Sequence, residues 1–418
     1  MTYVFDKLFG FLNSSKLGRK PNRGIRSELV QFIKICTDIY RRRESPRITR
    51  YVVSATSINP SNLSGLGSDG YVNLIPLRQA KLNINLSRAC SPVPGLDFDH
   101  RFNKYYQEYG YKGGQVGVIV DAKLAFAKGY GKTHEHEDVY AHTVVPISAI
   151  SKGLTSVAIL KMAENGDISL DNKVFGPNKT LGSIKPFKNI SPDPKIYDIT
   201  IDHLLRHTAG WNSTKSKLYD PLLNTALLQN GYKIHNITAD MHLSQLMTPE
   251  DVISYMMSQP LDFTPGTQSV ISNLGYLILG RIIEEVSGDS YRDYVKKHVL
   301  IPCGMMHTKI GRPRLHTKKR DANEPIFNDA VDISPNFVDS ALGWESNAYD
   351  MMRFAQCLDG GADFKILSDN SLRILQARPR DVPAQRSNSW MGAGFYVNNH
   401  GAVWIEGEFY TGRFAVLP

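Results

Sequence analysis

Residues 145–155 read VPISAISKGLT and have the pattern of a helix start that could carry a nucleophile. Side chains three or four residues apart share one face of a helix, so a hydroxyl one turn before Lys152 would meet the lysine amine. The helix dipole and burial both lower a lysine pKa, which lets the amine take the hydroxyl proton and prepare acyl transfer. The residue three positions before Lys152 is Ala149, whose methyl group cannot attack a carbonyl.

Two nearby serines are alternative nucleophiles. Ser148 is four residues before Lys152 and shares its helical face, but its backbone would have to shift by about one residue to place the hydroxyl correctly. Ser151 is adjacent to Lys152 and points about 100° away around the helix, which makes it the weaker candidate. We expect neither serine to act as a nucleophile, and we expect Lys152 to pair with a carboxylate rather than serve as a catalytic amine.

Metal and disulfide chemistry have weaker support. His203 and His207 are spaced i and i+4, as two zinc ligands on a helix would be. No third ligand or catalytic carboxylate follows in the expected pattern, so we predict no metal site and no cofactor. The cysteines are far apart and have no C-x-x-C spacing, which predicts reduced thiols; they are Cys36, Cys90, Cys303 and Cys357.

The elements that must position these residues indicate an α+β domain. Alternation over residues 114–131 predicts two strands joined by a turn at Asp121-Ala122. Apolar periodicity predicts helices that end at Gly166 and Gly288 in two cases; the predicted helices cover residues 98–109, 149–165, 274–286 and 347–358. Strands near the ends of this region and helices in its middle predict a central antiparallel sheet flanked by helices.

Composition and charge exclude several classes of protein. The chain has 418 residues, of which 42% are hydrophobic and 21% charged, as in soluble globular proteins, and no apolar run is long enough to span a bilayer. Residues 1–50 carry a net charge of +8 out of the total of +9, so nucleic-acid binding is not expected for the main domain. The arginines at positions 41, 42, 43, 47 and 50 could contact phosphate, anionic lipid or an import receptor, or be a solvated tail. We predict an intracellular protein and leave cytoplasm and mitochondrion open.

From about residue 95 onward the chain resembles the serine β-lactamase and penicillin-binding-protein superfamily, in particular the branch of class C β-lactamases and animal β-lactamase-like proteins. Five blocks carry the resemblance in the same order and spacing: ISAISKGLTSVAILKMAENGDISLDNKV, ITIDHLLRHTAGW, FTPGTQSVISNLGYLILGRIIEEVSG, VLIPCGMMHT and ALGWESNAYDMMRFAQCLDGG. The resemblance implies a β-lactamase/transpeptidase-like fold, a central antiparallel sheet flanked by helices with an inserted all-helical region. A basic extension, residues 1–94, precedes it, with one short helix in residues 27–40 and a linker.

The family's three motifs are degenerate here. Its S-x-x-K motif falls on Ala149 to Lys152, and its Y-x-N motif falls on Ile271-Ser272-Asn273, where isoleucine replaces the proton-relaying phenol. Asn273 could bind a substrate amide or cap the helix that follows, and we weigh these roles equally. The K-T-G or H-x-G motif aligns with residues 405–407, Ile-Glu-Gly, which lack the basic residue; His400-Gly401 is an alternative in the preceding turn. Glu406 or Glu408 would repel a substrate carboxylate.

The end of the chain also departs from the family, whose members usually continue beyond a strand resembling GRFAVLP with a further strand and helix. The chain stops at Pro418, so the resemblance predicts a domain over residues 95–418 that is truncated at its end, with a sheet edge left for a partner or self-association. We predict a pseudoenzyme that acts by binding a small acyl or peptide-like ligand or by assembly. The alternatives are an active serine hydrolase or esterase using Ser148 with Lys152, and docking on an anionic membrane surface through the basic arm.

Overall fold

The computed structural model supports a description of most of the chain after residue 97 and one earlier strand. The short helix expected within residues 27–40 and the linker at 59–70 lie outside the described residues. The described residues are 51–58, 98–108, 113–120, 123–132, 137–189, 191–212, 237, 240–242, 247–311, 337–359, 365–380, 382, 388–407 and 412–417.

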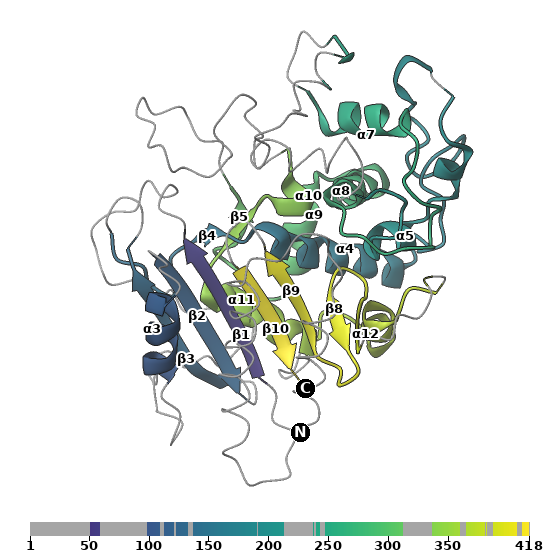
Figure 1. Ribbon diagram of the computed structural model, residues 1–418. Helices are drawn as coiled ribbons and strands as arrows, with labels where there is room; N and C mark the ends of the chain where they lie inside the picture. Colours follow the sequence, from purple (N-terminus) through teal and green to yellow (C-terminus); the bar gives the residue numbers. More distant parts are fainter. Residues whose placement is uncertain are drawn as a thin grey trace.

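The described residues form a seven-stranded antiparallel sheet in the order β3-β2-β1-β10-β9-β8-β7 (Figure 1). A second, smaller sheet has the order β4-β6-β5. The strands are β1 Tyr51–Ile58, β2 Gly113–Val120, β3 Lys123–Gly131, β4 Val145–Pro146, β5 Lys309–Ile310, β6 Trp344–Ser346, β7 Ser389–Met391, β8 Tyr396–Asn398, β9 Val403–Gly407 and β10 Gly412–Leu417.

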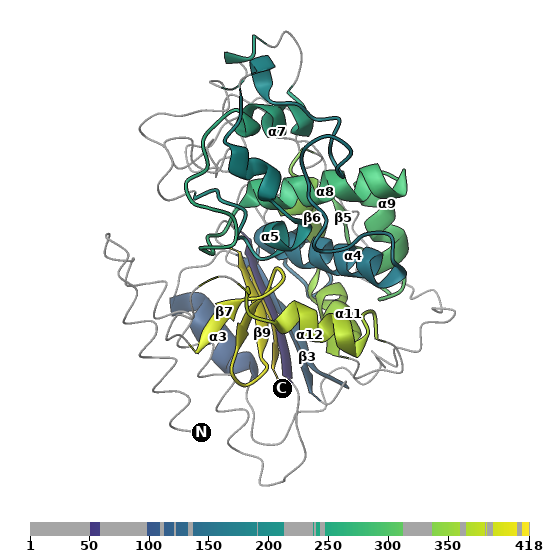
Figure 2. The same ribbon diagram turned by 90° about the vertical axis from the view of Figure 1, so that its right-hand side faces the viewer.

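Helices cover both faces of the large sheet. Figure 2 shows α3 on one face and α11 and α12 on the other, while α4, α5 and α7 to α9 form a helical region beyond one end of the strands. The predicted α+β fold with a central antiparallel sheet is therefore confirmed. The helices are α3 Phe98–Glu108, α4 Ser151–Asn165, α5 Ile201–Leu205, α7 Pro249–Met257, α8 Asn273–Ser287, α9 Tyr291–Val295, α10 Asp339–Leu342, α11 Ala348–Asp359 and α12 Asp369–Gln376, with short turns η2 Ser148–Ile150, η3 Phe187–Asn189, η4 Pro194–Asp198 and η5 Lys296–Leu300.

The longest helices end where the sequence predicts. Gly166 closes α4 with φ 83° and Gly288 closes α8 with φ 73°, both left-handed conformations that favour glycine. Helix α4 is buried along nearly its whole length, including Leu154, Val157 and Leu160. It packs against α8, α9 and α10 and therefore forms the centre of the hydrophobic core.

Strand β1 lies between β2 and β10, where the sequence predicted an unpaired edge of the sheet. Tyr51 to Ala55 pair with Leu417 to Arg413 of β10, and Tyr51 to Ile58 pair with Val120 to Gly113 of β2. The predicted unpaired edge beside the GRFAVLP strand is wrong, because β1 pairs with β10 along its length. Residues before position 95 thus contribute a strand to the sheet, although the boundary at 94–95 stays a prediction.

The prediction of reduced thiols is wrong for one pair of cysteines. Cys303 and Cys357 form a disulfide with their Cα atoms 5.7 Å apart and a sequence separation of 54. Both side chains are buried in the core. The pair joins the turn after η5 to α11, two segments whose proximity depends on the tertiary fold and leaves no local spacing pattern to detect.

None of the described helices combines the length and apolar character that crossing a bilayer requires.

Candidate functional site

The start of α4 places Ala149 in a strained turn. Residues 148–150 form the single turn η2, which leads directly into α4 at Ser151. Ser148 is buried and has φ 46°, a left-handed conformation that costs a residue with a Cβ about 1–2 kcal/mol. Ala149 follows it and is partly exposed. Strain of this kind often collects at functional sites, and here it immediately precedes the position expected for the nucleophile.

Lys152 and Ser151 have different environments on the first turn of α4. Ser151 is fully buried, and its Oγ accepts a hydrogen bond of 3.2 Å from the Trp344 backbone N–H. That bond ties Ser151 to β6. Lys152 is also buried, and its charge acts on His207, whose pKa it helps to lower.

His207 connects the segment after α5 to the start of α8. Its imidazole Nδ1 accepts a 3.1 Å hydrogen bond from the Ser272 backbone N–H, and its ring lies 4.9 Å from that of Tyr276. His207 itself has φ 57°. Burial, followed by the charge of Lys152, lowers the His207 pKa to about 3. His207 is therefore a neutral acceptor at ordinary pH.

The second motif lies at the N-terminus of α8. Ser272 is the N-cap, since its Oγ accepts a 3.1 Å bond from the Gly275 N–H, and Asn273 is the first helical residue. The capping role considered for Asn273 is therefore wrong, because the preceding serine fills it. Asn273 is buried, and Ile271 has 41% of its surface exposed. An apolar side chain is thus presented where the family motif would offer a phenol.

Strand β9, which carries the third motif position, packs against Gly153, the residue after Lys152. A Cβ added to Gly153 would lie 2.6 Å from Ile405 Cδ1 and 3.1 Å from Phe395 Cζ, so β9 packs tightly on the first turn of α4. In β9, residues 405–407 pair with β10, while Val403 and Trp404 pair with both β10 and β8. Glu406 stands in β9 opposite Arg413 in the register, Glu408 lies outside the described residues, and His400 is exposed in the turn before β9.

The structure thus brings the three motif positions together. The η2–α4 junction contacts β9, α4 packs against α8, and His207 accepts a hydrogen bond from the Ser272 N–H at the start of α8. At these positions the chain offers an amine, an amide and two hydrocarbon side chains. Such a set can hold a polar ligand by hydrogen bonds, but Ala149 and Ile271 supply neither a nucleophile nor a proton relay.

His203 and His207 have separate structural roles. His203 Nδ1 accepts a 3.2 Å bond from the Thr200 N–H and completes a capping box at α5, whereas His207 Nδ1 accepts from Ser272. One nitrogen of each ring is therefore already used by a backbone N–H. Among the described residues, no cluster of three or more His, Cys, Asp or Glu side chains is arranged to hold a metal.

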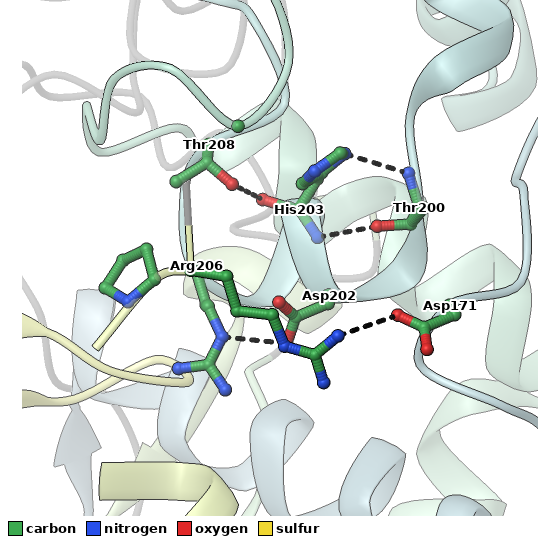
Figure 3. Close-up of a pocket in the computed structure, with 9 residues that line it drawn as sticks. Asp171, Thr200, Asp202, His203, Arg206 and Thr208 are labelled. Carbon is green, nitrogen blue, oxygen red and sulfur yellow. Dashed lines mark hydrogen bonds and ion pairs between the residues drawn. The ribbon is translucent and has the colours of Figure 1, made fainter. Parts of the chain in front are cut away.

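A polar pocket of about 210 Å³ beside α5 was not predicted. Figure 3 shows His203, Arg206 and Thr208 around it, with Asp171 and Asp202 near the guanidinium groups. Its charges are largely matched internally: Arg206 Nε donates to Asp202 at 2.7 Å, and Arg380 lies 3.7 Å from Asp171. The other two Arg206 nitrogens donate to the carbonyls of Ala377 and Ile374, so this arginine anchors the segment after α12 rather than a ligand.

Sequence reasoning missed His207 as the link within the site. His207 lies in the block ITIDHLLRHTAGW, four residues after His203. This spacing is typical of two zinc ligands on a helix and so drew attention to metal binding instead. The usable signal was the turn pattern His-Thr-Ala-Gly directly after α5, because histidine tolerates a left-handed backbone better than most residues. The role of His207 as an acceptor for Ser272, 65 residues away, has no local sequence signature.

Comparison with known proteins supports the same fold. A family model described as beta-lactamase matches residues 98–418. The protein PbpX of Bacillus subtilis (strain 168) is 24% identical over 327 residues, which cover 74% of this chain and 70% of PbpX. Penicillin-binding protein 4* of the same organism is 25% identical over 195 residues, covering 46% of this chain and only 36% of that protein.

Solved structures agree on the fold. The octameric penicillin-binding protein homologue from Pyrococcus abyssi has a TM-score of 0.55 and 22% sequence identity, covering 76% of this chain and 72% of that one. This likeness concerns the fold alone. Since the chain spans about a third of penicillin-binding protein 4*, activity cannot be carried over from that relative as a whole.

Proposed function

The chain belongs to the beta-lactamase family, and on that premise we propose that it is a member without acyl-enzyme chemistry at its motif positions, acting by binding a ligand or a partner. Ala149 carries this proposal. It occupies the strained start of α4, three residues before the buried Lys152, where the chemistry needs a hydroxyl. The exposed Ile271 supports it, because a second proton-handling group is absent at the start of α8.

The residues that remain indicate the class of ligand. Asn273 can orient an amide, and residues 405–407 of β9 have backbone groups on the side away from β10. The aligned third motif has Glu406 in place of a basic residue, which disfavours a ligand carboxylate. We therefore expect a neutral acyl or peptide-like ligand rather than a penicillin-like anion.

Intact-protein mass spectrometry tests the loss of chemistry. The protein is incubated with an activated acyl ester or a fluorescent penicillin, and adducts are mapped by peptide. We expect no adduct on the peptide that spans the η2–α4 junction, because a methyl group at position 149 cannot be acylated. An adduct there that disappears in Ser148→Ala would overturn the proposal.

Restoring the missing groups tests the scaffold. The double variant Ala149→Ser with Ile271→Tyr returns a hydroxyl and a phenol to the motif positions, and Ala149→Ser alone is the matched control. We expect acylation to rise by about 10²-fold or more in the double variant, the usual contribution of a positioned acid–base group. No gain in either variant would show that the surrounding site has diverged as well.

Active hydrolysis through Ser148 is the second candidate function. Its positive φ is the observation in its favour, since backbone strain often accompanies catalytic residues. Its burial counts against it, because only 4% of the residue is exposed to an incoming ester. The Ser148→Ala comparison above separates the two functions.

A further inference from the structure

Strand β1 occupies an interior position of the large sheet. All eight of its residues pair with β2, and five of them also pair with β10, both in antiparallel register. In the described part of the chain, β1 is the only strand that pairs with this side of β2 and with this side of β10. The sheet is therefore continuous only through Tyr51–Ile58.

The strand comes from outside the segment that the family model covers. That segment begins at residue 98, whereas β1 ends at Ile58, and residues 59–97 connect it to α3. Such a connection is long compared with the usual two to six residues between neighbouring elements. The residues that match the family therefore form a sheet with a gap between β2 and β10, and an upstream segment fills it.

Filling this gap has a large physical effect. Without β1, both β2 and β10 would expose a row of unpaired N–H and C=O groups, which is an aggregation hazard. The sheet would separate into the β2–β3 hairpin, which is marginal as a two-stranded unit, and the β7–β10 part. Helix α11 contacts β1, β2 and β10, and Met352 of α11 packs on Gly117 of β2. This helix therefore covers one face of the sheet at the gap.

The gap between β2 and β10 holds an extended segment without charged residues. Antiparallel backbone pairing on two sides supplies the recognition, as in other cases where a strand is added to a sheet. The occupant, YVVSATSI, has no charged residue and is rich in valine, threonine, tyrosine and isoleucine, which favour strands. Ala55 lies opposite Arg413, which lies opposite Glu406, so the occupant supports the strand that carries the third motif.

We propose that the gap between β2 and β10 is a strand-binding site, and that Tyr51–Ile58 occupies it as a separable strand that remains bound when the connection to α3 is cut. The functional domain then begins at Tyr51 and includes a segment that the family match omits. The basic residues 1–50 end directly before this strand. Tyr51 pairs with Leu417, at the opposite end of β10 from the Arg413–Glu406 pair. Residues 1–50, here called the arm, therefore join the sheet at the end remote from the candidate site.

Cleavage of the full chain tests the proposal. A recognition sequence for a site-specific protease is inserted after Gly65, and the cut protein is analysed by size-exclusion chromatography and native mass spectrometry. We expect the two fragments to elute as one particle in a one-to-one ratio and to separate only in denaturant. Release of the N-terminal fragment from a remainder that stays folded would overturn the proposal, as would a particle with two copies of each fragment.

Variants of the cut protein identify the binding element. Val53→Pro removes a backbone donor in an interior strand, so we expect fragment release to be faster by on the order of tenfold or more. Val53→Ile keeps the donor and the β-branched side chain and should retain the fragment. Hydrogen exchange on the uncut parent chain is a measurement that does not require the proline variant to fold. The amides of residues 51–58 should be protected from exchange. Exchange of these amides at the rate of an unfolded peptide would contradict the proposal.

Discussion

His207 holds two parts of the candidate site through one neutral imidazole. The ring accepts a bond from the Ser272 N–H, and burial together with the charge of Lys152 lowers its pKa to about 3. An unfolded chain would bind a proton at this residue near pH 6.5. Between pH 6.5 and about 3 the unfolded state therefore binds more protons than the folded state, and stability falls as the pH falls through this window.

The first prediction concerns this acid sensitivity. His207 should contribute a loss of about 1.4 kcal/mol for each pH unit below 6.5, and nothing above it. In His207→Asn the side chain does not titrate, tolerates the left-handed backbone and can still accept a bond from Ser272. Denaturant melts at pH 7 and pH 4.5 should therefore differ less in His207→Asn than in the parent protein.

A matched variant separates titration from packing. His207→Ala also removes the titrating group, but it leaves the Ser272 N–H without its acceptor, which costs about 1–3 kcal/mol at every pH. Equal acid slopes in the parent protein and both variants would contradict a neutral buried histidine.

At this scale the sequence predicts candidate residues but not the contacts between them. Ala149 and Lys152 follow from local spacing, and Ile271 and Asn273 follow from the resemblance to the family's Y-x-N motif. The sequence did not show that Ser272 rather than Asn273 is the N-cap of α8, because both residue types are good caps. It also did not show the hydrogen bond from Ser272 to His207, because these residues are 65 positions apart. Long-range hydrogen bonds leave no periodic pattern in a sequence.

Among the elements, two glycines with the same backbone conformation allow a sharp comparison. Gly394 has φ 78° and Gly401 has φ 79°. A Cβ at Gly394 would collide with Ser156 Oγ and Tyr276 Oη, which are joined by a 2.8 Å hydrogen bond, whereas a Cβ at Gly401 would meet nothing within 4 Å.

The second prediction follows from this pair. Gly401→Ala should cost about 1–2 kcal/mol, the strain of a left-handed alanine alone. Gly394→Ala should cost a further 1–3 kcal/mol or so, because the core around α4 and α8 must move to admit the methyl group. Chemical denaturation of both variants measures the difference, and equal losses would show that the contact with Ser156 and Tyr276 is not tight.

The Cys303–Cys357 disulfide supports the third prediction. A cross-link that closes a loop of this length restricts the unfolded chain by about 4 kcal/mol in the chain-entropy model. Thermal unfolding under reducing conditions should therefore occur at a lower temperature than under non-reducing conditions. The double variant Cys303→Ala with Cys357→Ala is the control, and its unfolding temperature should not respond to the reductant; an unchanged parent protein would contradict the bond.

The four predicted helices match α3, α4, α8 and α11 to within a few residues, because apolar periodicity and, for α4 and α8, terminal glycines mark them locally. The shorter helices α5, α7, α9, α10 and α12 were not predicted. The fold class followed from the order of strands and helices. Strand β1 was missed because its place in the sheet depends on pairing with β2 and β10, two strands far away in the sequence. Local pattern shows that a segment favours a strand but does not show which partners it will have.

For the whole molecule, the charge is divided between two parts. The first 50 residues carry +8 of the total +9, so the remainder is nearly neutral. A neutral domain gives little attraction for an anionic surface, whereas each lysine or arginine near such a surface contributes about 1 kcal/mol. Any docking on anionic lipid should therefore depend on the arm and should weaken as salt shortens the range of the attraction.

The fourth prediction tests this division with vesicles containing phosphatidylserine. The full chain should sediment with them at low salt and lose binding as salt is raised, and a variant that begins at Tyr51 should not bind. Its melting temperature should stay the same, because β1 and all its partners remain. Replacing five arginines of the arm by glutamine, at positions 41, 42, 43, 47 and 50, should abolish binding. As the control, five exposed lysines of the domain are replaced by glutamine, and this equal loss of charge should have little effect on binding. Binding that survives the arginine substitutions would show that the domain itself attracts the vesicles. The control lysines are Lys104, Lys179, Lys188, Lys195 and Lys296.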